Sequence, residues 1–118
     1  MSEGRQYIIN VLEICQQILD QIKPAPQIEN FLNQIKEARE KLEGLKDKVY
    51  LKTKKGITDA YMALETAKAL ETKLDEWKSL SAEKTKEILD ELESDLAAFV
   101  TNVETLEGSA KSRTVVIT

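Results

Sequence analysis

The apolar residues of this chain recur every three or four positions, which is the spacing of side chains along one face of an α-helix. Between residues 7 and 22 they cover an arc of roughly 160° around the helix axis, wider than the stripe of about 100° that one neighbour requires. The pattern therefore predicts a helix over about residues 4–23, held between two neighbouring helices. Its inward positions are Tyr7, Ile8, Val11, Leu12, Ile14, Cys15, Ile18, Leu19 and Ile22.

Three further segments repeat this rhythm. A second helix is predicted over about residues 26–54, with the alternating spacings of three and four that are typical of a packed helical seam. A third is expected over 58–79 and a fourth over 82–107. Gly56 and Gly108 are expected to end the second and fourth helices, Thr58 or Gly56 to open the third, and Ser81 to cap the fourth.

Two prolines separate the first two helices. Pro24 disfavours helical backbone at Lys23, and the φ angle of Pro26 suits the first turn of a new helix, so the pair predicts a corner. Short connections make consecutive helices antiparallel neighbours, which predicts an all-α, antiparallel up-down-up-down four-helix bundle over residues 1–108. In the alternative, the first two helices unbend and pair with another chain, as hinge prolines permit.

The last residues, "SAKSRTVVIT", change from helix formers to small, basic and β-branched types. A flexible C-terminal tail is expected over 109–118. The alternative is that residues 114–118 add as a strand to another protein, because they carry no charge and no proline.

Composition narrows the class of protein. The chain has 118 residues, 42% of them hydrophobic and 32% charged, with four glycines and two prolines, which indicates one folded helical domain. Its apolar runs are far shorter than the roughly 20 residues that cross a bilayer. The first ten residues show no export-signal pattern, so a cytoplasmic location is expected.

Little in the sequence points to catalysis or to metal binding. The chain contains no histidine, the commonest general base and zinc ligand, and its one cysteine, Cys15, lies among apolar residues and is expected to be a buried, inert thiol. Glu83, Glu87 and Glu91 recur every four residues but lie off the apolar seam, and bundle di-metal sites also require histidine. We expect a protein that is not an enzyme and has no metal or cofactor.

Charge is distributed unevenly along the chain. Residues 36–55 hold eight basic and four acidic side chains, whereas residues 83–107 hold eight acidic and two basic ones. The densest basic cluster lies at the predicted C-terminal end of the second helix, where it is a candidate site for the phosphates of nucleic acid or an anionic membrane. Cations also complement the helix dipole there, and the overall net charge is −4. The cluster consists of Lys46, Lys48, Lys52, Lys54 and Lys55.

Two short strings resemble a known family and its ligands. The segment "IKPAPQIENFLNQIKE" resembles the first corner of focal adhesion targeting domains, which are four-helix adaptor bundles, over about 20 of the 118 residues. The string "LDELESDL", residues 89–96, is similar to the leucine-aspartate motifs that such domains bind, although its leucines also form the seam of the fourth helix. The resemblance is to a four-helix bundle fold, and the two short strings do not carry the function of that family over to this chain.

Taken together, the sequence favours a non-catalytic protein–protein interaction module, an adaptor, chaperone-like or accessory bundle. Its partner would be an amphipathic helix in a groove between two helices, or a second copy of the chain. The alternative is an anionic surface bound through the basic cluster, with an affinity that falls steeply with salt. The candidate partner contacts are apolar residues outside the inward arcs, namely Ile9, Tyr50, Leu51, Met62 and Ala69.

Overall fold

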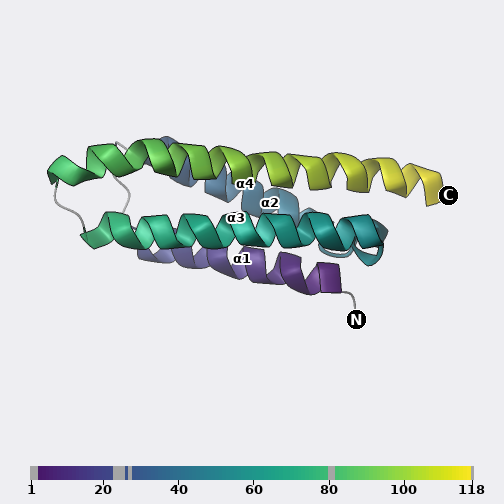
Figure 1. The fold of residues 1–118 in the computed structure, drawn as a ribbon. Helices are drawn as coiled ribbons and strands as arrows, with labels where there is room; N and C mark the ends of the chain where they lie inside the picture. Colours follow the sequence, from purple (N-terminus) through teal and green to yellow (C-terminus); the bar gives the residue numbers. More distant parts are fainter. Residues whose placement is uncertain (1–2, 23–25, 27, 80–81, 118) are drawn as a thin grey trace.

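The protein is an all-α four-helix bundle. The computed structural model describes residues 3–22, 26, 28–79 and 82–117, with the side chains of 78–79, 82–87 and 111–117 excepted. The elements are α1 (Glu3–Gln21), α2 (Glu29–Leu45), a short 3-10 helix η1 (Val49–Lys52), α3 (Lys54–Ser79) and α4 (Ala82–Ile117). They form a rod of 54 × 22 × 19 Å (Figure 1), and the described residues contain no strand.

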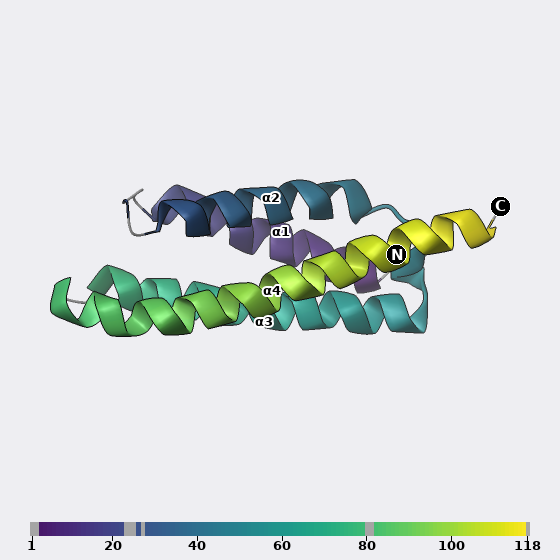
Figure 2. The same ribbon diagram turned by 90° about the horizontal axis from the view of Figure 1, so that it is seen from above.

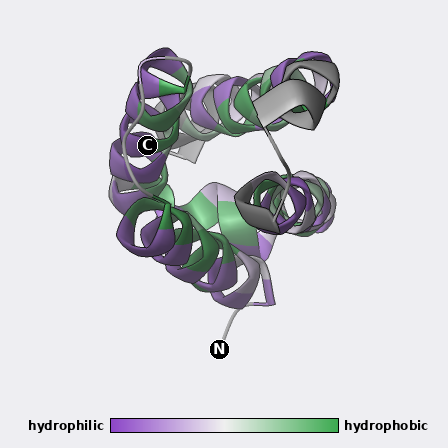
Figure 3. Ribbon diagram, turned by 90° about the vertical axis from the view of Figure 1, so that its left-hand side faces the viewer, coloured by the Kyte–Doolittle hydropathy of each residue, from purple (hydrophilic) through white to green (hydrophobic). Residues whose placement is uncertain are grey.

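The helices alternate in direction along the chain, but their neighbours differ from the prediction. α1 packs against α2 and α3, and α4 packs against the same two helices, so α2 and α3 lie on a diagonal of the bundle (Figure 3). The expectation that all consecutive helices are adjacent is therefore wrong for α2 and α3. The connection over residues 46–53 is longer than expected, and its helix η1 lies across the end of the bundle in contact with α1, α3 and α4.

The ends of α2 and the start of α3 also differ from the prediction. α2 begins at Glu29 rather than near Pro26 and ends at Leu45, and Gly56 lies inside the first turn of α3 instead of ending α2. Thr53 is the residue that opens α3, because its Oγ1 accepts a hydrogen bond from the Gly56 backbone N–H at 3.0 Å. The same hydroxyl donates to the Tyr50 carbonyl oxygen at 2.7 Å, which ties the cap to η1.

Two glycines allow η1 to lie close to its neighbours. A Cβ atom at Gly4 of α1 would overlap the Leu51 carbonyl oxygen, and one at Gly56 of α3 would overlap the Tyr50 carbonyl oxygen. Both obstacles are backbone atoms, which a side-chain rotation cannot move away. The absence of a side chain at these two positions therefore fixes how η1 closes the end of the bundle.

The interior of the bundle is apolar. None of the described polar or charged residues is buried, and the hydrophobic faces of the helices turn inward (Figure 3). The prediction that α1 is held between two neighbours is confirmed, since α1 contacts α2 and α3 and its residues Leu12, Ile14 and Leu19 are partly buried beside the core. Such a core stabilises the fold mainly through the removal of apolar surface from water.

α4 is longer than predicted. It continues through Gly108 to Ile117 and extends beyond the other helices at the end where α1 begins (Figures 1 and 2), so residues 109–117, expected to form a flexible tail, are helical. Gly108 does not adopt the positive φ that would end a helix, and Ala110 is buried against the bundle end. Residues 114–117, for which a strand added to another protein was the alternative, are helical in this single chain. Ser81 and Thr118 lie outside the described residues.

Candidate functional site

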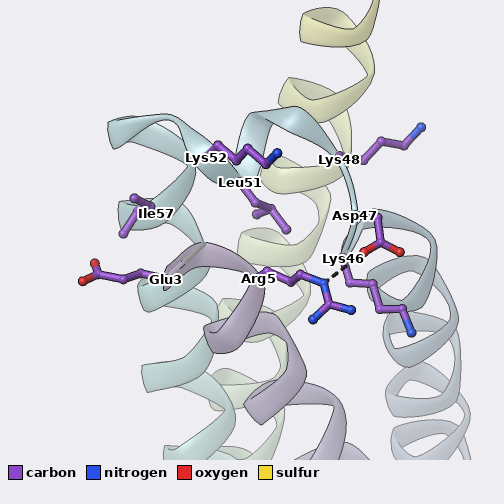
Figure 4. A pocket seen from close by; sticks show the side chains of 8 residues that line it. All are labelled: Glu3, Arg5, Lys46, Asp47, Lys48, Leu51, Lys52 and Ile57. Atoms are coloured by element: carbon purple, nitrogen blue, oxygen red, sulfur yellow. Dashed lines mark hydrogen bonds and ion pairs between the residues drawn. The ribbon is translucent and has the colours of Figure 1, made fainter. Parts of the chain in front are cut away.

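A depression of about 680 Å³ lies at the end of the bundle where α1 begins. α1, the turn after α2, η1 and the first part of α3 each contribute side chains to it (Figure 4). We call it the bundle-end pocket. It is lined by Glu3, Arg5, Lys46, Asp47, Lys48, Leu51, Lys52 and Ile57.

The charged groups of the bundle-end pocket are only partly neutralised by one another. Arg5 Nε donates a hydrogen bond to Asp47 Oδ1 at 3.0 Å, which links α1 to the turn after α2, and Lys46 Nζ lies 2.6 Å from Glu43 Oε1. The side chains of Lys48 and Lys52 form no hydrogen bond or ion pair within the described part of the chain. These two cations therefore give the pocket most of its uncompensated positive charge.

Three of the five lysines of the predicted basic cluster line the bundle-end pocket. Lys46, Lys48 and Lys52 line it, whereas Lys54 and Lys55 are exposed in the first turn of α3 and do not. The explanation that the cluster complements the dipole of a helix over 26–54 is wrong for Lys54 and Lys55. They lie at the N-terminal, positive end of α3, where the dipole disfavours cations.

The predicted apolar contact residues do not form one surface. Tyr50 and Leu51 are each only 1% exposed, so the premise that they lie outside the core is wrong. They are buried because η1 lies across the end of the bundle, and Tyr50 Oη also donates a hydrogen bond to Asp59 Oδ2. Ile9 is half-buried on α1, while Met62 (50% exposed) and Ala69 are exposed on α3 and line neither the bundle-end pocket nor the groove below.

A second depression of about 290 Å³ lies between α2 and α4. Figure 2 shows α4 inclined to α2, with the two helices further apart where α2 begins than where it ends. We call this depression the α2–α4 groove. It is lined by Asn30, Phe31, Gln34, Leu89, Leu92, Glu93, Leu96 and Ala97.

The remaining reactive groups lie apart from these two depressions. Burial raises the pKa of the Cys15 thiol to about 12, which agrees with the predicted buried and unreactive cysteine. A hydrogen bond to Glu65 raises the pKa of the exposed Tyr61, whose ring also packs edge-on against Tyr7 at 5.6 Å between centroids. Within the described residues, no three cysteine, aspartate or glutamate side chains gather as metal ligands would, and no helix is long and apolar enough to cross a bilayer.

Sequence reasoning missed Glu3, Arg5, Asp47 and Ile57 of the bundle-end pocket, and two of them, Arg5 and Asp47, form its ion pair. In the sequence, Arg5 and Asp47 look like ordinary surface residues. They meet because the turn between α2 and η1 lies beside the start of α1. The one local signal is Gly4, a small residue within the first turn of a helix. Comparison of the chain with family models, curated proteins and solved structures finds no match.

Proposed function

We propose that this protein is a non-catalytic recognition module that binds an acidic segment of another protein in the bundle-end pocket. The observation that carries the proposal is the composition of that pocket, in which four cations from α1, the turn after α2 and η1 line the same depression as Leu51 and Ile57. Carboxylates of a bound segment would pair with Lys48 and Lys52, and its apolar side chains would lie against Ile57 and the aliphatic stems of the lysines.

An acidic protein segment fits this pocket better than a nucleic-acid backbone does. The cations are confined to one end of the rod, whereas nucleic-acid sites usually extend as a basic stripe along which phosphates can track. Glu3 and Asp47 also line the pocket and would repel phosphates placed beside them. A protein segment can present neutral or basic residues to those two carboxylates and acidic residues to the lysines.

Reversal of the two unpaired cations tests the proposal. We expect Lys48→Glu with Lys52→Glu to weaken binding of a fluorescently labelled peptide of glutamate and leucine by roughly tenfold, because two attractions become repulsions. Fluorescence anisotropy measures this affinity. Raising NaCl from about 0.05 M to about 0.5 M should weaken binding to the natural chain as well.

The matched control reverses two lysines elsewhere on the surface. Lys36→Glu with Lys68→Glu changes the net charge by the same amount, but both residues are exposed and neither lines the pocket. Equal losses in the two double variants would show general attraction to an acidic peptide and contradict the proposal. Tighter binding to oligothymidylate or to phosphatidylserine vesicles than to the peptide would assign the pocket to those ligands instead.

A further inference from the structure

The α2–α4 groove lies directly over the hydrophobic core on the side of the bundle. Phe31 of α2 and Leu92 and Leu96 of α4 form its floor, and each is also a member of the core. Leu89 is only half-buried at its edge. The apolar surface that a partner would remove from water is that of Leu89 and of the exposed Ala97, because Phe31, Leu92 and Leu96 are 7%, 1% and 4% exposed.

The edges of the groove are polar and acidic. Asn30 and Gln34 of α2 and Glu93 of α4 line it. Residues three or four positions apart share a helix face, and one turn from Gln34 and Glu93 the charged side chains are those of Glu37 and Asp90, both exposed. Gln34 and Glu93 have no lysine or arginine one turn away, whereas Asp90 has Lys86 one turn before it.

We propose that the α2–α4 groove binds a basic amphipathic helix of a partner protein. The lining residues extend over Asn30 to Gln34 on α2 and Leu89 to Ala97 on α4, which is room for anchor side chains on successive turns of a bound helix. Lysines or arginines flanking those anchors would face the carboxylates of Glu37, Asp90 and Glu93. This site is independent of the bundle-end pocket, shares no residue with it and selects a partner of the opposite charge.

Filling the groove tests this inference. The probe is a fluorescein-labelled amphipathic peptide of leucine and lysine, and the readout is fluorescence anisotropy. Ala97→Phe places a ring at an exposed position that lines the groove, whereas Ala98→Phe adds the same ring at the next residue, which is exposed and does not line it. We expect Ala97→Phe to weaken binding by about tenfold or more and Ala98→Phe to change it by less than about twofold.

A second pair of variants acts from α2 by charge instead of by volume. Gln34→Lys brings a cation to the groove edge, while Asn33→Lys brings one to the neighbouring exposed residue that does not line it. We expect Gln34→Lys, but not Asn33→Lys, to weaken peptide binding by about threefold to tenfold. This pair keeps the test decisive if circular dichroism shows that Ala97→Phe is misfolded.

Equal effects within both pairs would overturn the inference, because the peptide would then bind the acidic surface in general. It would also be overturned if a peptide of the same composition in scrambled order bound as tightly. Association of the chain with phosphatidylcholine vesicles that Ala97→Phe abolishes would assign the groove to lipid. A light-scattering mass of twice 13.3 kDa that Ala97→Phe halves would assign it to a second copy.

Discussion

At the scale of single residues, the glycines differ in what surrounds them. Gly56 lies against the Tyr50 carbonyl oxygen, so a Cβ atom there would force η1 or α3 to move. Gly108 lies in the interior of α4. Apart from the backbone of its own helix, no atom lies within 4 Å of a Cβ atom added there. The same chemical change therefore has opposite consequences at the two positions.

Alanine substitution at these two glycines makes that difference measurable. We expect Gly56→Ala to lower the free energy of unfolding by about 2 kcal/mol, since overpacking against backbone outweighs the gain in helix propensity. Gly108→Ala should raise it by about 0.5–1 kcal/mol, because alanine restricts the unfolded chain and favours helix. Urea denaturation of the two variants measures both values, and a stabilising effect of Gly56→Ala would show that η1 does not pack as described.

The sequence identified Gly56 as a special position but assigned it the wrong role. A glycine after "KTKK" resembles a helix end. The residues that follow it in the sequence do not indicate that the backbone of η1 lies beside it. The burial of Tyr50 and Leu51 was missed for the same reason, because a contact between η1 and three helices is a property of the tertiary arrangement. Cys15, whose burial follows from helical periodicity alone, was predicted correctly.

At the scale of secondary-structure elements, the start of α3 depends on Thr53. Its hydroxyl accepts from the Gly56 N–H and donates to the Tyr50 carbonyl oxygen, while its backbone carbonyl accepts the first helical bond, from the Ile57 N–H at 2.9 Å. One residue thus ends η1 and begins α3. The chain direction at this corner determines where Lys48 and Lys52 lie in the bundle-end pocket.

Removal of the Thr53 hydroxyl should destabilise the protein by about 1–2 kcal/mol, as expected for loss of an N-cap. Thr53→Ala is the test variant. Thr58→Ala is its control, because the Thr58 hydroxyl is exposed on α3 and bonds only to the Lys54 carbonyl oxygen of its own helix. Thermal unfolding followed by circular dichroism compares the two, and a control that loses as much stability as Thr53→Ala would refute the capping role.

The existence of the four helices was predictable, whereas their ends and their neighbours were not. Apolar periodicity extends over whole helices, so it locates α1 to α4 within a few residues at most ends. The break between α2 and η1 is not visible in that periodicity, because Val49 continues the spacing of Leu45 although it is 48% exposed in the structure. The diagonal placement of α2 and α3 follows from the route of residues 46–53 across the bundle end, which no local pattern encodes.

At the scale of the whole molecule, the linings of the two depressions differ in charge, although the net charge is only −4. Four basic side chains line the bundle-end pocket, and the carboxylate of Glu93 lines the α2–α4 groove. Debye screening at physiological salt limits the reach of exposed charges to about 8 Å, so each site acts on its ligand through its own residues. The two proposals together describe a bundle that holds two different segments at once.

Independence of the two sites is therefore the prediction that belongs to the molecule as a whole. We expect Lys48→Glu with Lys52→Glu to change binding of the basic leucine–lysine peptide by less than about twofold, and Ala97→Phe to leave binding of the acidic peptide equally unchanged, because distant sites without shared partners behave additively. Anisotropy measurements on the natural chain, on each variant and on the combined variant quantify any coupling between the two sites. Loss of both affinities in either variant would mean that one surface binds both peptides, since two separate sites cannot lose affinity together unless the fold itself is damaged. Circular dichroism of each variant distinguishes these two causes.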